Sequence, residues 1–297
     1  MTTILPEAFR APLPAWRQVL PLAALLLLPA LGAGDETVEI EYPADGSVAP
    51  YVPTVEEDVE LMLDVAGVAP GDYVIDLGSG DGRIAIAAAM RGAFAHGVEI
   101  EPELVELARR NARRAGVDAR TAFVEGDIFD ADIAAASVVT LYLFPDANIA
   151  LRPKLLAELA PGTRVVSNSF DMGEWLPDVH DTSARSSGGI LLWIVPADVA
   201  GEWSIEIDGD GDGRAPERHT LRVAQRFQQI ELTLARADGA RTTIADATLR
   251  GDRIAFRAVA GARTYAFSGR IDGDSIDGYV QVGDDAGTVV RRWRAAR

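Results

Sequence analysis

The feature that most constrains this chain is a run of three closely spaced glycines, Gly78, Gly80 and Gly82. The apolar residues 73–77 before the run predict a buried strand, and the alanine-rich residues 83–89 after it predict a helix. Glycine allows the connecting backbone to turn sharply and to approach a ligand closely, while the first amides of the helix favour a polar or anionic group. NAD-binding sequences place two residues between the second and third glycines, whereas this chain places one. The run therefore predicts a ligand site between a strand and a helix, of a different type from the dinucleotide site.

Strands and helices alternate over the first two thirds of the chain. Buried strands are expected at 73–77, 96–100, 121–125, 137–142, 163–169 and 190–195. Helical periodicity marks 103–114 and 147–159, and the Thr-Val-Glu-Glu capping box at 54–57 predicts a helix that ends near Ala66. The Gly/Ser-rich residues 183–189 predict a mobile loop. Together these patterns predict an α/β fold, with a Rossmann-like doubly wound parallel sheet over residues 51–196.

From residue 201 the pattern changes to short alternating segments that Gly and Asp turns separate. Eight strands are expected, at 203–208, 220–227, 230–235, 242–249, 253–259, 264–271, 275–282 and 288–294. They predict a second, antiparallel all-β domain over residues 197–297. Both an open meander and a lipocalin-like barrel fit this spacing.

The N-terminal residues 1–34 resemble a targeting segment. The uncharged apolar run 19–34 follows Arg10 and Arg17, precedes two acidic residues, and ends in small residues suited to cleavage. Sixteen residues with two prolines are shorter than the ~20 residues that span a bilayer, which favours a signal peptide over a membrane anchor. The flanking charges place the following residues outside the cytoplasm. We therefore expect an exported or membrane-anchored protein with membrane or envelope association, and a linker at 35–50.

Composition narrows the classes of partner. The net charge is −17; residues 1–200 contain 30 acidic and 13 basic side chains, and residues 201–297 contain 15 of each. Such a surface repels phosphate backbones and attracts cations, so we expect no nucleic-acid partner. The absence of cysteine and the presence of only three histidines argue against a metal site. The Asp/Gly run 208–213 imitates half of a calcium loop, but its twelfth position is His219 instead of Glu, so we expect an acidic hairpin tip.

Acidic residues end three successive predicted strands. Asp76, Glu99 and Asp127 would meet at one edge of a parallel sheet, where carboxylates accept hydrogen bonds from an ammonium group, ribose hydroxyls and an adenine amine. A negative site is also compatible with a cationic ligand that aromatic faces hold. The candidates for such faces are Tyr51, Tyr142, Phe144 and Trp175.

An ordered set of motifs along residues 50–195 resembles a known family. The motifs are Pro50-Tyr51-Val52-Pro53-Thr54, Asp76–Arg83, Gly97-Val98-Glu99, Asp127-Ile128-Phe129, Phe144-Pro145 and Trp175-Leu176-Pro177-Asp178. They resemble the class I S-adenosylmethionine (SAM) methyltransferases that include the mitochondrial ATP synthase c-subunit lysine methyltransferase and its bacterial relatives.

The resemblance implies protein-lysine N-methylation, with SAM as the cofactor and a protein that presents a lysine as the partner. The expected cofactor-binding residues are Tyr51, Thr54, Asp76, Gly78, Ser79, Gly80, Glu99, Asp127 and Ile128, with residues 51–54 folding over the methyl donor. Transfer to an amine mainly requires positioning of a neutral nucleophile. Tyr142 and Asp146, at the end of the fourth strand, are expected to orient that amine, and Tyr51 is a further catalytic candidate.

Two departures from the family leave alternatives open. The exported-looking N-terminus conflicts with SAM, which is made inside cells, so a cytoplasmic location remains an alternative. The β-rich tail has no counterpart in the lysine methyltransferase and is interpreted as a separately folding module for substrate or envelope recruitment. The alternatives are a methyltransferase that acts on a small molecule or lipid, and an exported binding protein without activity.

Overall fold

The computed structural model describes residues 27–28, 38–39, 52–209, 215–236, 241–284 and 287–297. Residues 1–50 and 51–297 form separate units, each considered by itself. In the first unit, β1 (Leu27–Leu28) pairs antiparallel with β2 (Val38–Glu39). Most of the predicted targeting segment 19–34 lies outside the described residues, so that prediction stays untested. Within the described ranges, no helix combines the length and apolarity that crossing a membrane requires.

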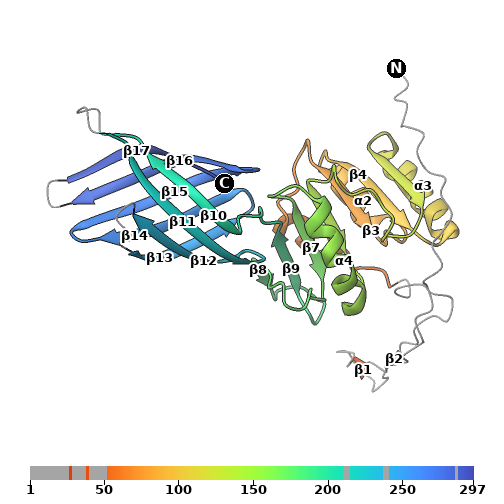
Figure 1. The fold of residues 1–297 in the computed structure, drawn as a ribbon. Helices are drawn as coiled ribbons and strands as arrows, with labels where there is room; N and C mark the ends of the chain where they lie inside the picture. Colours follow the sequence, from red (N-terminus) through yellow and green to blue (C-terminus); the bar gives the residue numbers. More distant parts are fainter. Residues whose placement is uncertain (1–26, 29–37, 40–51, 210–214, 237–240, 285–286) are drawn as a thin grey trace. The chain divides into compact units, whose positions relative to one another are not determined.

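Residues 52–199 contain a seven-stranded mixed sheet of order β5-β4-β3-β6-β7-β9-β8 (Figure 1). Its strands are β3 (Tyr73–Leu77), β4 (Phe94–Glu99), β5 (Thr121–Glu125), β6 (Val138–Leu141), β7 (Arg164–Asn168), β8 (Val179–Asp181) and β9 (Ile190–Ile194). The first five are parallel, and β9 and β8 continue the sheet antiparallel. The central strands are apolar almost throughout because helices cover both faces.

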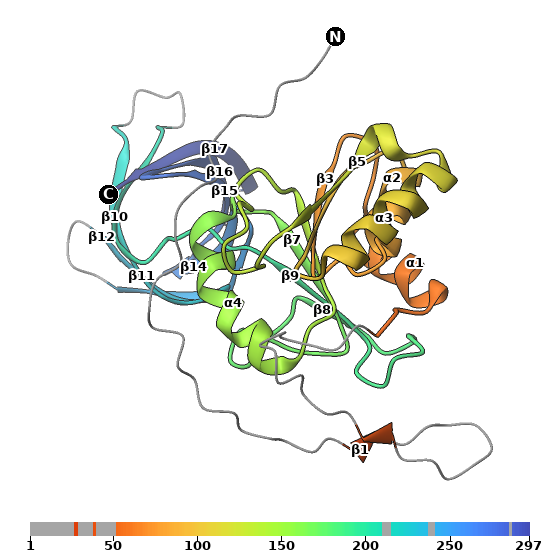
Figure 2. The same cartoon turned by 90° about the vertical axis from the view of Figure 1, so that its right-hand side faces the viewer.

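The helices are α1 (Glu56–Val65), α2 (Arg83–Met90), α3 (Pro102–Ala115) and α4 (Pro145–Glu158), with the short 3₁₀ helix η1 (Asp118–Arg120). Buried side chains of α1, α2 and α3 share one core on one face of the sheet. Figure 2 shows α4 on the opposite face. The predicted doubly wound sheet is thus confirmed.

One local prediction was wrong, and one strand of this sheet was not predicted. The capping box at residues 54–57 does not form: Val55 is the N-cap of α1, and the Thr54 carbonyl instead accepts a hydrogen bond from Arg83 at 2.6 Å. Strand β8 was not predicted, because its three residues are largely exposed and carry no apolar run. It forms because the backbone of residues 179–181 pairs with the edge of β9 that would otherwise be unpaired.

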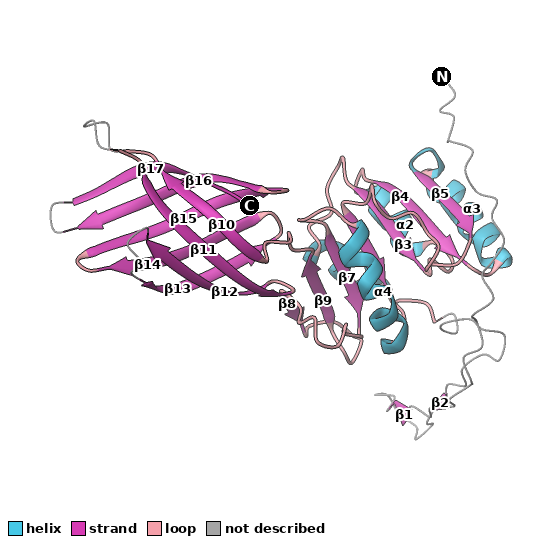
Figure 3. Ribbon diagram, in the orientation of Figure 1, coloured by secondary structure: helices cyan, strands magenta, loops and turns pink. Residues whose placement is uncertain are grey.

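Residues 201–297 form a closed eight-stranded barrel, which Figure 3 shows as strands without helices. The strands are β10 (Gly201–Ile207), β11 (Glu217–Arg226), β12 (Gln229–Arg236), β13 (Arg241–Arg250), β14 (Arg253–Ala260), β15 (Arg263–Asp272), β16 (Ser275–Asp284) and β17 (Gly287–Ala296). Each strand pairs antiparallel with the next, and β17 closes the barrel on β10 from Ser204↔Ala296 to Ile207↔Trp293. All eight predicted strands are present. Of the two predicted alternatives, the open meander and the barrel, the structure shows the closed barrel. The Asp/Gly run 208–213 joins β10 to β11, but most of it lies outside the described residues.

An aromatic cluster fills the barrel interior. Trp293 is fully buried, and its ring meets Phe267 edge-on at 5.3 Å between centroids. Its Nε1 donates to the Ser268 carbonyl at 3.0 Å, so the indole N–H is satisfied. A Cβ added at Gly269 would lie 2.7 Å from the indole, so glycine leaves the space that this ring occupies. The packing of the barrel interior around Trp293 therefore depends on one large side chain and on glycine beside it.

We expect Trp293→Ala to lower the free energy of unfolding by about 3–5 kcal/mol, because it creates a large cavity. Gly269→Ala should cost about 1–3 kcal/mol through overpacking. Urea denaturation followed by near-ultraviolet circular dichroism measures both changes. Tyr279→Ala, at a side chain that is 57% exposed, is the control and should stay within about 0.5 kcal/mol of the original protein. Equal stability of all three variants would contradict this account of the core.

Candidate functional site

The glycine turn connects β3 to α2 at the carboxyl edge of the parallel strands. Gly78, Gly80 and Gly82 have φ angles of +80°, +52° and +82°, a region that glycine adopts without strain. The amides of Gly78 and Ser79 donate to the Val98 carbonyl at 2.9 and 3.0 Å, which fixes the turn to the end of β4. The turn is therefore a rigid part of the sheet edge.

Asp76 lies at the centre of the site and is only 2% exposed. Its Oδ1 accepts a hydrogen bond from the Thr140 hydroxyl at 2.6 Å, across the β3–β6 pair in which the two residues are in register. Its Oδ2 is buried and has no hydrogen-bond partner among the described residues. Burial raises the pKa of Asp76 to about 7, the Thr140 hydrogen bond opposes the rise, and the nearby charges of Glu99 and Asp81 add to it. A cationic group at Oδ2 would stabilise the ionised form.

Glu99 ends β4 beside the glycine turn. Its Oε2 accepts from the Gly80 amide at 2.8 Å, and its Oε1 accepts from the amides of Ile100 and Glu101 at 2.8 and 3.1 Å. The carboxylate is thus held by backbone donors in one orientation, against the turn that the sequence predicts to lie beneath the ligand. Oε1 already accepts two hydrogen bonds, whereas Oε2 accepts one and keeps acceptor capacity for a hydroxyl.

Asp127 and Ile128 follow β5 at the same edge. The Asp127 Oδ1 accepts from the Phe129 amide at 2.9 Å, and Ile128 is buried. The Gly126 amide donates to the Glu99 carbonyl at 2.9 Å, which brings this loop to the end of β4. The structure therefore gathers the three predicted strand-end acids at one edge of the sheet.

Arg83 connects the segment before α1 to the glycine turn. Its Nη2 pairs with the Asp81 Oδ2 at 2.8 Å, and its Nη1 donates to the Thr54 carbonyl. Thr54 is buried, and the expectation that residues 51–54 fold over the methyl donor stays a prediction. Tyr51, predicted both to bind the cofactor and to take part in catalysis, lies outside the described residues.

Aromatic side chains lie where β6 and β7 end. Tyr142 stacks on Phe170 with 6.4 Å between ring centroids and an interplanar angle of 20°, and Phe144 meets the same ring at 5.9 Å. Burial and, secondarily, the nearby Asp58 charge raise the pKa of Tyr142, so its hydroxyl stays protonated at neutral pH. Asp146 is exposed in the first turn of α4, so of the two predicted orienting residues only Tyr142 is part of this cluster.

Trp175 was a candidate for holding a cation, but it is fully buried between Trp193 and Phe227. Its ring faces are therefore covered by other aromatic rings, and it does not belong to the ligand-facing wall. Its place in the structure follows from packing against β9 and the barrel.

The sequence did not single out Thr140, Asp58 or Asn148. A polar residue within the apolar run 138–141 was the available signal for Thr140. Asp58 is buried, and its two oxygens accept from the amides of Arg185 and Ser186 at 2.7 and 2.9 Å, fixing part of the loop predicted to be mobile. The Asn148 amide nitrogen donates to the Phe170 carbonyl at 3.1 Å and supports the aromatic wall. Contacts over such sequence distances left no local pattern.

These donors and acceptors fit SAM. The Oδ2 of Asp76 and the Oγ of Ser79 are buried polar atoms without hydrogen-bond partners in the described part of the chain. The Asp76 carboxylate can pair with a positively charged amino group, and the Glu99 carboxylate can accept a hydrogen bond from a hydroxyl. SAM, a nucleoside with an amino-acid tail, carries these two kinds of group at its two ends.

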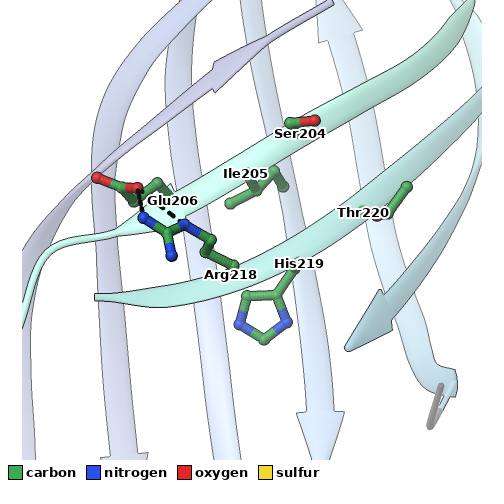
Figure 4. Close-up of a pocket in the computed structure, with 6 residues that line it drawn as sticks. All are labelled: Ser204, Ile205, Glu206, Arg218, His219 and Thr220. Carbon is green, nitrogen blue, oxygen red and sulfur yellow. Dashed lines mark hydrogen bonds and ion pairs between the residues drawn. The ribbon is translucent and has the colours of Figure 1, made fainter. Parts of the chain in front are cut away.

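A hollow lies on the barrel, at strands β10 and β11 (Figure 4). It has a volume of about 350 Å³. Glu206 and Arg218 form an ion pair across the strands at 3.2 Å, while His219, opposite Ile205 in register, alternates with Arg218 along β11. Both paired groups are considerably exposed, so this ion pair contributes little to stability. The hollow lacks the buried acidic groups that characterise the sheet edge.

We expect SAM affinity to rise with pH through about 7, because a cation binds the ionised form of Asp76 better than the protonated form. Affinity at pH 8 should be about tenfold higher than at pH 6, as measured by calorimetry. The same group should make the folded protein less stable as pH rises through about 7, since the raised pKa favours the protonated folded state. Asp76→Asn should bind weakly without this pH dependence, and Thr140→Val should move its midpoint to higher pH. A flat pH profile for the original protein would contradict the assignment.

Comparisons with known proteins agree with this geometry. Residues 76–179 match the model of the ANTKMT methyltransferase domain. A protein-lysine N-methyltransferase of Saccharolobus islandicus is 48% identical over 130 residues, which are 43% of this chain and 81% of that protein. The adenine nucleotide translocase lysine N-methyltransferase of Mus musculus is 40% identical over 163 residues, 50% of this chain and 71% of that protein.

Among solved structures, one described as an RNA methyltransferase from Salinibacter ruber in complex with S-adenosyl-L-homocysteine is 48% identical. The alignment covers 50% of this chain and 96% of that chain, with a TM-score of 0.47. From the sequence matches and the glycine turn with its buried strand-end acids, we conclude that the chain belongs to the ANTKMT methyltransferase-domain family and is a SAM-dependent class I methyltransferase.

Proposed function

We propose that this methyltransferase acts on lysine side chains of a protein. The observation that carries the proposal is that relatives sharing 48% and 40% identity, each covered over more than two thirds of its length, are named for lysine methylation.

The aromatic wall suits a lysine side chain. Tyr142, Phe144 and Phe170 offer apolar faces on which the lysine methylenes can pack, and the buried Asp58 charge acts on Tyr142. A negative charge beside the wall also favours an ammonium group. The wall follows β6 and β7, and Asp76 lies on β3, the strand adjacent to β6.

The amine must lose its proton before it attacks. Bound SAM supplies a methyl group on a positively charged sulfur. Free lysine has a pKa of ~10.4, and desolvation against Tyr142 and Phe170 would lower the pKa of the ammonium group. The Tyr142 hydroxyl, protonated because its own pKa is raised, can accept a hydrogen bond from the amine and aim its lone pair. Asp76, Glu99 and Asp127 are proposed to hold the cofactor.

A small molecule or lipid is the second candidate substrate. The observation in its favour is the closed barrel of residues 201–297, which lies beyond the segment that matches the family model. A barrel can collect a ligand, but the described interior is packed with large side chains such as Trp203 and Trp293. This packing favours the protein substrate.

Transfer of tritium from labelled SAM tests the proposal. The purified full chain is incubated with extracts of cells from which its gene has been deleted, and the products are separated into protein, nucleic-acid and lipid fractions. We expect label in a protein band, recovered as methyl-lysine after acid hydrolysis. Label confined to the lipid, small-molecule or RNA fraction would overturn the lysine proposal.

Two variants serve as controls for that experiment. Asp76→Asn should lose label together with SAM affinity. Tyr142→Phe keeps the stacked ring but loses the hydroxyl, so kcat should fall about 10- to 100-fold with SAM affinity unchanged. If Tyr142→Phe retains full kcat, the hydroxyl does not orient the amine.

We further propose that residues 19–34 direct export or membrane retention, on the basis of their apolar composition and flanking charges. Intact mass and fractionation of the native protein measure this. Cleavage near Ala33 or recovery with membranes is expected. A full-length product in the cytosolic fraction would overturn the proposal and would remove the conflict with the supply of SAM.

A further inference from the structure

The turn between β11 and β12 contacts three consecutive residues of the loop between β7 and β8. Arg226 pairs with Glu174 at 2.6 Å, Phe227 stacks on Trp175 at 6.1 Å between centroids, and the Gln228 amide donates to the Leu176 carbonyl at 2.6 Å. Solvent screens the exposed Arg226–Glu174 ion pair, so this pair contributes little to stability. The contact between the Phe227 and Trp175 rings is the less exposed of the two. The barrel therefore contacts the sheet through a specific residue-by-residue match.

Phe227 has an unusual backbone for an aromatic residue. It opens a two-residue hairpin turn, closed by the Arg226↔Gln229 pair, and has a φ of +56°. Glycine is the favoured residue at such a position, because a Cβ strains the left-handed conformation. Non-glycine residues retain strained conformations where the surrounding structure determines them, often at functional sites. The two-residue turn accounts for this φ, and the contact with Trp175 gives a reason for an aromatic side chain at the position.

The ring contact continues toward the aromatic wall through α4. The Arg152 guanidinium lies over the Phe227 ring at 5.5 Å, and its Nη1 donates to the Met172 carbonyl at 2.8 Å. Met172 and Trp175 form a bridge within the same loop. Phe227 thus contacts Arg152 and Trp175. Both of these residues pair with Met172, which follows Phe170 by two positions.

Phe170 is the central ring of the wall, since both Tyr142 and Phe144 pack on it. Its backbone carbonyl accepts from Asn148 of α4. Residues 169–175 are consequently held from α4 and from the barrel turn, while the Asp76 and Glu99 carboxylates are fixed by β3, β4 and β6. A change at Phe227 should therefore alter the acceptor side of the site and leave the cofactor side intact.

We propose that Phe227 is a positioning residue for methyl transfer: the barrel turn that carries it holds the 169–175 loop so that Phe170 and Tyr142 form the acceptor wall. The inference rests on the proposed function only in naming the aromatic wall as the acceptor side. The barrel is then a structural part of the acceptor site, in addition to any role in recruitment.

The test uses Phe227→Ala, Phe227→Gly and Phe227→Trp in the full chain. Hydrogen exchange of residues 169–175, SAM affinity, and kcat and KM for the labelled acceptor are measured. We expect Ala and Gly to speed exchange in this loop and to lower kcat/KM at least about tenfold, with SAM affinity within about twofold of the original. Trp preserves an aromatic face and should restore both readouts. Tyr279→Ala, on an exposed barrel surface, is the matched control and should change neither.

The glycine variant separates the ring from the backbone. Glycine adopts a φ of +56° without strain, so barrel stability should be kept while the ring contact is lost. If Phe227→Gly or Phe227→Ala leaves exchange and kcat/KM unchanged, the proposal is overturned. Failure of the lysine proposal is recognised separately, because the exchange readout needs no acceptor and the kinetic readout uses whichever fraction takes the label.

Discussion

The site depends on a buried carboxylate that the protein itself does not neutralise. Asp76 accepts a hydrogen bond from Thr140, and burial, reinforced by the charges of acidic neighbours, raises its pKa to about 7. Burying such a group is costly unless a partner offsets the cost. A ligand with a positive charge would supply that partner. We propose that the surrounding turn and the Glu99 carboxylate, which backbone amides hold, bind the rest of the cofactor.

The acceptor side is built by different means. Its aromatic rings come from the ends of β6 and β7, and its loop is held by Asn148, Arg152 and Phe227 from three separate elements. The proposed cofactor side is thus built from backbone geometry within the parallel sheet, whereas the proposed acceptor side is built from side-chain packing.

The barrel obeys a separate set of packing rules. Alternating apolar residues face inward, closure removes the free edges of its strands, and glycines at positions such as 269 leave room for Trp293. The same barrel contributes the strained turn at Phe227. A module with its own core can therefore also form part of the neighbouring site, and these two roles are compatible.

Local patterns in the sequence were sufficient for the order of the strands along the chain, the glycine turn and the three strand-end acids, because strand burial, glycine conformation and strand ends depend on neighbouring residues. The β-rich character of residues 201–297 was likewise predictable, but barrel closure was not, since it depends on pairing between β10 and β17. The false capping box at Thr54 and the missed strand β8 show where a tertiary partner overrides a local preference. Only the tertiary structure decided that Asp146 is exposed and that Trp175 is enclosed by Trp193 and Phe227. It also decided that Thr140 contacts Asp76, because a contact between residues 64 positions apart leaves no periodic signal in the sequence.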